Sequence, residues 1–139
     1  MADAADSIRD HFRRISPEDV ISVYLFGSEA RGGTHDESDV DVGVLFDPAR
    51  STRSSERARR RTEIASDLIA ATHRNEVDVV VLNDAGPELA ASVVQQGRRL
   101  YCTDEETDRR FVRDAILRWS DLRPWLRRMR TLKAESLAK

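Results

Sequence analysis

Residues 27–44 read GSEARGGTHDESDVDVGV, and this stretch decides the fold. It joins two short apolar runs, at about residues 20–26 and 39–46, that are rich in β-branched and aromatic side chains. Runs of this length and composition are typical of buried strands. The stretch therefore predicts a strand, a glycine-rich turn and a second strand that opens with two aspartates.

The turn after the first strand is suited to an anionic oxygen. Gly27 ends the strand, and Ser28 can serve as the N-cap of a short helix that begins at Glu29. Such a turn directs free backbone N–H groups outward, Gly27 admits a phosphate close to the backbone, and the Ser28 hydroxyl adds a donor. The same dipeptide also fits an ordinary helix N-cap, which is the commoner case.

The two aspartates of the second strand are a stronger signal. Side chains alternate along a strand, so Asp39 and Asp41 share one face, with Cα atoms ~6.7 Å apart. Two carboxylates side by side repel each other and disfavour the sheet unless a cation lies between them. Carboxylate oxygens are ligands that Mg²⁺ prefers. The two halves of the stretch together indicate a site for a metal-bound nucleoside triphosphate.

The whole stretch resembles the signature of the DNA polymerase β-type nucleotidyltransferases, which is Gly-Ser, a spacer and Asp-x-Asp. More narrowly, it is similar to the minimal nucleotidyltransferases, small domains often paired as antitoxins with HEPN-type toxins. The resemblance is dense over residues 27–44 and looser elsewhere. The matching positions are Gly27, Ser28, Ala30, Arg31, Gly32, Ser38, Asp39, Asp41 and Val44.

The resemblance also implies a third carboxylate at the start of a neighbouring strand. Residues 76–82 read EVDVVVL, and Asp78 matches the family position because apolar residues follow it. Glu76 shares its face by the two-residue period and is the competing candidate. The other interpretation of Asp78 is a strand-start acid or a salt-bridge partner.

Composition fits a compact catalytic core. The 139 residues predict one domain, 1–139, with a core at about 18–102 and a C-terminal helical segment at about 104–136. A net charge of −2 argues against direct nucleic-acid binding. The N-terminus lacks an apolar leader, and no run is long enough for a membrane. The single Cys102 suits a reducing cytoplasm, and the three scattered histidines lack zinc-ligand spacing.

Hydrophobic periodicity predicts an α/β fold. Helices are expected at residues 3–15 and 52–73 and after Pro87, with Gly97 closing the last of them. Further strands are expected at 77–82 and 99–102. The resemblance implies that the strands form a small mixed, largely antiparallel sheet flanked by helices.

The start of the predicted 52–73 helix is basic. The plain interpretation is a solvated helix face, and the alternative is a contact to a triphosphate tail or an RNA partner. The basic residues are Arg53, Arg57, Arg59, Arg60 and Arg61.

The C-terminal segment has an amphipathic helical pattern, and Pro124 should kink it or start a new helix there. One interpretation is a helix that packs back on the sheet. The other is a partner-docking helix, because Trp119 and Trp125 lie beside arginines and both residue types favour interfaces. The apolar positions are Val112, Ala115, Ile116, Trp119, Leu122, Leu126 and Met129.

The resemblance implies an enzyme that transfers AMP from ATP to a hydroxyl and releases pyrophosphate, with two Mg²⁺ ions. It assigns catalysis and metal binding to Asp39, Asp41 and Asp78. It assigns nucleotide binding to Gly27, Ser28, Arg31 and Ser38. Arg31 either pairs with phosphate or acceptor, or bridges acids structurally.

The absence of an added acceptor domain favours a protein acceptor. By resemblance, this acceptor is a HEPN-type toxin encoded nearby, silenced by AMP on a tyrosine, so that the chain is its antitoxin. The alternatives are transfer to a small molecule, an antitoxin that acts by binding without catalysis, and a nucleotide-sensing module.

Overall fold

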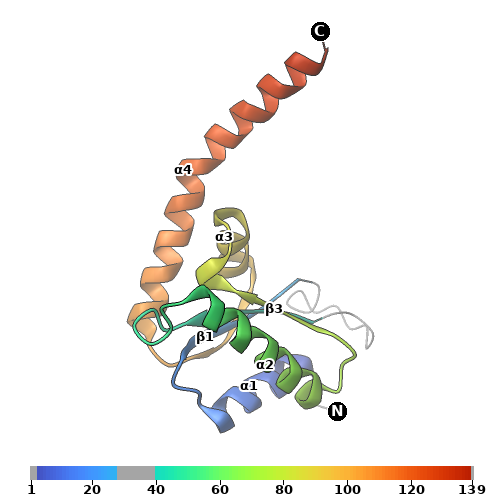
Figure 1. The fold of residues 1–139 in the computed structure, drawn as a ribbon, viewed down its shortest axis with the longest axis vertical. Helices are drawn as coiled ribbons and strands as arrows, with labels where there is room; N and C mark the ends of the chain where they lie inside the picture. Colours follow the sequence, from blue (N-terminus) through green and yellow to red (C-terminus); the bar gives the residue numbers. More distant parts are fainter. Residues whose placement is uncertain (1–2, 28–39, 139) are drawn as a thin grey trace.

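A mixed four-stranded sheet with helices on both faces organises the chain (Figure 1). The computed structural model describes residues 3–27 and 40–138. The elements in chain order are α1 (Ala4–Ile15), β1 (Val20–Phe26), β2 (Val40–Phe46), α2 (Ser54–Thr72), β3 (Val77–Val81), the 3₁₀ turn η2 (Leu82–Asp84), α3 (Pro87–Gln96), β4 (Arg98–Cys102) and α4 (Glu105–Ala138).

The strand order is β3-β2-β1-β4, so the two strands that flank the glycine-rich stretch are central. β1 is antiparallel to both β2 and β4, and β2 is parallel to β3. This arrangement confirms the expected mixed, largely antiparallel sheet. The predicted element boundaries also hold to within two residues, and Pro87 and Gly97 lie at the two ends of α3 as expected.

Strand alternation divides the core into two layers. Val40, Val42 and Val44 face α1 and α2, where Phe12 and Leu68 are fully buried. The intervening residues of β2 face the other way, and Leu45 packs there with side chains from β1, η2 and α3. Asp41 belongs to this second set by the same alternation. The sheet therefore separates the α1/α2 layer from the face that carries the acidic residue.

The C-terminal segment forms one helix, α4, of 34 residues, which is ~50 Å at 1.5 Å per residue. The chain stays helical through Pro124, so no new helix starts there, and Figure 1 shows the helix axis changing direction partway along. No helix within residues 3–27 and 40–138 has both the length and the apolar character that crossing a membrane requires.

The two halves of α4 have different environments. The first half packs against α3 and β1, and Ala115 is buried there. The second half projects from the body of the molecule (Figure 1), and its Trp125, Met129 and Leu132 are about half exposed. Packing back on the fold is thus confirmed for the first half. Partner docking by the second half stays a prediction.

A buried carboxylate fixes the start of α4 to the sheet. Asp108, only 2% exposed, accepts hydrogen bonds from Ser22 Oγ and Tyr24 OH of β1, both at 2.7 Å. Its second oxygen accepts from Arg99 Nη1 of β4 at 3.0 Å. Burial and the hydrogen bond to Asp108 raise the pKa of Tyr24, so this phenol remains a donor. No local pattern distinguishes Asp108 in the sequence, because it is one of three acids in the first turn of α4.

We expect Asp108→Ala to lower the free energy of unfolding by about 3 kcal/mol, because two buried hydroxyl donors lose their acceptor. Urea denaturation followed by circular dichroism measures the change. The matched control is Asp114→Ala, on the same helix but exposed, which should stay within about 0.5 kcal/mol of the parent. Equal midpoints for the two variants would show that the Asp108 contacts contribute nothing to stability.

Candidate active site

The structure brings Asp41 and Asp78 together from distant parts of the sequence. β2 and β3 run parallel, and their register makes these two residues direct Cα partners. Adjacent strands lie ~4.8 Å apart. Both side chains belong to the sheet face turned away from α1 and α2, since Val40 and Val42, and likewise Val77 and Val79, occupy the other face. Two of the three predicted carboxylates therefore flank one point of the sheet.

Gly27 lies immediately beside this pair. It follows the last residue of β1, and Phe26 is the antiparallel partner of Asp41. Gly27 has φ +76°, which side-chain-bearing residues rarely adopt. A Cβ atom at this position would lie 2.5 Å from Asp41 Oδ2. A residue with a Cβ would strain this left-handed turn and crowd the Asp41 carboxylate, and glycine avoids both.

Four predicted site residues lie outside the described residues: Ser28, Arg31, Ser38 and Asp39. Their assigned roles stay predictions. Among the residues that the structure describes, no three His, Cys, Asp or Glu side chains are grouped as a metal site requires. The described part of the site accordingly supplies two carboxylates, and the third predicted ligand is Asp39.

The register of β3 bears on the choice between Glu76 and Asp78. Both line a cavity of about 330 Å³ together with Asp41, Val77 and Ile69. Glu76 precedes the first residue of β3, whereas Asp78 lies within β3 and is paired with Asp41. The position of Asp78 favours it as the acid that acts with Asp41.

Most of the basic side chains at the start of α2 are engaged in ion pairs. Arg60 binds Asp19 through Nε at 2.6 Å, and Arg59 pairs with Glu56 and Glu63 on its own helix. Arg57 binds Asp84 through two nitrogens, at 2.9 and 2.8 Å. The Arg57 guanidinium holds the pKa of the Asp84 carboxyl below its usual value. These three arginines thus have structural partners within the chain.

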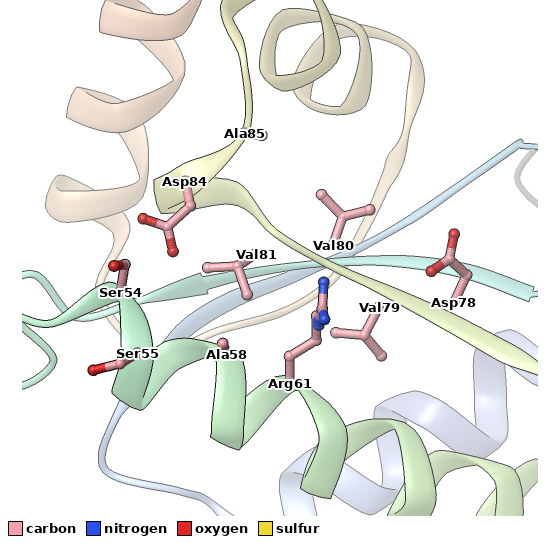
Figure 2. A pocket seen from close by; sticks show the side chains of 10 residues that line it. All are labelled: Ser54, Ser55, Ala58, Arg61, Asp78, Val79, Val80, Val81, Asp84 and Ala85. Carbon is pink, nitrogen blue, oxygen red and sulfur yellow. The ribbon is translucent and has the colours of Figure 1, made fainter.

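Arg61 differs from its neighbours. It lines a groove of about 560 Å³ between α2 and β3, and Figure 2 shows its side chain directed toward β3. Asp78 lines the same groove, so one of the two paired carboxylates borders this space. In the sequence, nothing distinguishes Arg61 from the four other arginines at the start of this helix. The groove itself depends on how α2 lies against the strand, which no local pattern indicates.

Comparisons with known proteins agree with this geometry. The family model described as Polymerase beta, Nucleotidyltransferase matches residues 8–106, from α1 into the first turn of α4. Protein adenylyltransferase MntA from Shewanella oneidensis is 36% identical over 86 residues, which cover 62% of this chain and 57% of that protein.

Two crystal structures share the fold over nearly their full length. One is a toxin–antitoxin with AMP-PNP, at 28% identity and a TM-score of 0.69, with 97% of this chain and 98% of that chain covered. The other is the toxin–antitoxin MntA-HepT, at 26% identity and a TM-score of 0.64, with 98% and 97% covered. With its sheet, its paired acids and the match over residues 8–106, the chain belongs to the polymerase beta nucleotidyltransferase family.

Proposed function

We propose that this chain is a Mg²⁺-dependent protein adenylyltransferase that transfers AMP from ATP to a tyrosine of a HEPN-type toxin and thereby acts as its antitoxin. The observation that carries the proposal is the register pairing of Asp41 with Asp78 beside the left-handed Gly27. The likeness to a protein adenylyltransferase supports the reaction. The likeness to toxin–antitoxin structures, one with AMP-PNP, supports the nucleotide and the partner.

The donor set fits a hard cation. Asp41 and Asp78 present carboxylates from neighbouring strands, an arrangement that is repulsive without a positive charge. Asp39, Asp41 and Asp78 are the residues that would hold Mg²⁺. When bound, the metal neutralises charge on the phosphate oxygens and on the departing pyrophosphate.

The residues of the chain then have distinct tasks. The tyrosine oxygen bonds to the α-phosphorus of ATP, and the bond from that phosphorus to the pyrophosphate oxygen breaks, with its electron pair leaving on pyrophosphate. Asp78, on the outer of the two strands, accepts the hydroxyl proton and passes it to water. Gly27 and Ser28 bind the terminal phosphates, and Arg31 and Ser38 contact the nucleotide. Because little covalent chemistry falls to the protein, positioning accounts for most of the rate.

A second candidate function is neutralisation by binding alone. The observation that favours it is the projecting half of α4, where Trp125, Met129 and Leu132 are exposed next to several arginines. Aromatic, Met and Arg side chains are enriched in protein interfaces. The double variant Asp39→Asn/Asp41→Asn separates the two functions, because binding alone would still neutralise the toxin.

Incubation of the chain with Mg²⁺, ATP and the HEPN-type toxin encoded beside its gene should increase the intact mass of the toxin by whole AMP units. We expect Asp41→Asn and Asp78→Asn each to slow this transfer at least about a hundredfold, because charge compensation at the phosphates is lost. Asp10→Asn, an exposed change on α1, should leave the rate unchanged. Omission of Mg²⁺ should abolish the transfer. Toxin that stays unmodified with the parent chain, yet is bound and inactive, would favour neutralisation by binding.

Gly27→Ala should lower the rate of AMP transfer by about a hundredfold, because the new Cβ displaces the Asp41 carboxylate and strains the turn. The mass assay measures the rate, and thermal unfolding verifies that the variant is folded. Gly86→Ala is the matched control, since a Cβ there meets nothing within 4 Å. A Gly27→Ala chain with parental activity would disprove the role given to this glycine.

A further inference from the structure

β3 is an edge strand with a functional residue at its start. One side of β3 pairs with β2, and the other side has no strand partner among residues 3–27 and 40–138. An edge strand presents backbone N–H and C=O groups that can pair with another extended chain. Asp78, the carboxylate proposed to accept the hydroxyl proton, is the second residue of this strand.

The open edge faces the groove between β3 and α2. Residues 78–81 form the strand side of the groove. The helix side is formed by Ser54, Ser55, Ala58 and Arg61. Figure 2 shows Asp78 at one end of the labelled set and Asp84 and Ser54 at the other. The groove therefore runs along the strand toward Asp78. Its volume of about 560 Å³ is in the range of specific binding sites.

The charges along the groove are unequal. Asp84 is neutralised by the two hydrogen bonds from Arg57. Arg61, in contrast, has no ion-pair partner within the described part of the chain, although its side chain is directed at the strand (Figure 2). The middle of the groove thus carries a positive charge that is available to an incoming carboxylate.

We propose that the β3–α2 groove binds an extended segment of the acceptor protein as an added strand on β3. The acceptor tyrosine lies at the Asp78 end, and an acidic side chain of the same segment pairs with Arg61. This inference rests on the proposed adenylyl transfer to a protein.

The geometry explains why this mode of binding serves the reaction. Main-chain hydrogen bonds to an edge strand supply affinity, and side-chain contacts supply specificity. A residue on the added strand opposite Asp78 is one strand spacing, ~4.8 Å, from it, and Asp78 is in turn the partner of Asp41. The added strand therefore fixes the acceptor hydroxyl beside the acids, which a freely diffusing side chain does not achieve.

The charge of Arg61 gives the first test. We expect Arg61→Glu to raise the KM for the HEPN-type toxin about tenfold, with kcat nearly unchanged, because only binding of the acceptor is weakened. Arg59→Glu makes the same charge change on the same helix outside the groove and should leave KM near the parental value. Calorimetric titration with AMP-PNP should show equal nucleotide binding in both variants.

The outcomes separate this inference from the proposed function. A parent chain that transfers no AMP counts against the proposed function. Normal transfer by the parent, with Arg61→Glu and Arg59→Glu indistinguishable in KM, overturns the groove inference and leaves the transferase intact. If Arg61→Glu weakens AMP-PNP binding as much as it raises the KM for the toxin, the groove inference is also overturned, because Arg61 would then bind ATP.

Hydrogen exchange on the complex tests the added strand directly and does not require turnover. Amides of residues 77–82 should exchange at least about tenfold more slowly with the toxin bound, while those of β4, the other edge of the described sheet, should not change. Unchanged exchange in β3 would overturn the inference. So would protection that grows with the concentration of this chain alone, since the edge would then pair with a second copy.

Discussion

The parallel pairing of β2 with β3 is the constraint on which the site depends. It sets Asp41 and Asp78 at the same level on neighbouring strands, with their side chains on the face away from α1 and α2. If the register of β3 against β2 shifted by one residue, one of the two carboxylates would point into the apolar layer, where burial of a charge is costly. The valines that alternate with the acids fix the register, so the same packing that buries the core also places the two acids side by side.

The antiparallel neighbour β1 completes the site from the other side. Gly27 follows its last residue, and the missing Cβ of this glycine leaves room for the Asp41 carboxylate. The same strand carries Ser22 and Tyr24, which hold the buried Asp108 at the start of α4. One strand thus connects the site to the helix that reaches furthest from the body (Figure 1). The long helix is anchored firmly at one end, while its other end keeps apolar side chains on the surface.

Two surfaces of the described structure are candidates for contact with a partner protein. The β3 edge and α2 form a groove in which, among the described residues, β3 has no further strand partner and the Arg61 guanidinium has no ion-pair partner. The far half of α4 offers aromatic and basic side chains. A transferase that acts on another protein needs such surfaces, because positioning the acceptor hydroxyl is the larger part of the work in phosphoryl transfer. In the proposed function, the groove would hold the acceptor segment, and an additional contact on α4 would add to the affinity without reaching the site.

Local periodicity and motif spacing in the sequence were enough to predict the two central strands, the glycine after the first and Asp41 on the second. The sequence also predicted α1 and α2, and α3 with Pro87 and Gly97 at its two ends. Only the tertiary structure shows what depends on contacts between distant elements: the register pairing of Asp78 with Asp41, the ion pairs of Arg57 and Arg60, the burial of Asp108 and the position of Arg61 in the groove, where the described residues give it no ion-pair partner. Each of these features depends on residues that are distant in sequence, and composition alone does not tell which acid pairs with which arginine.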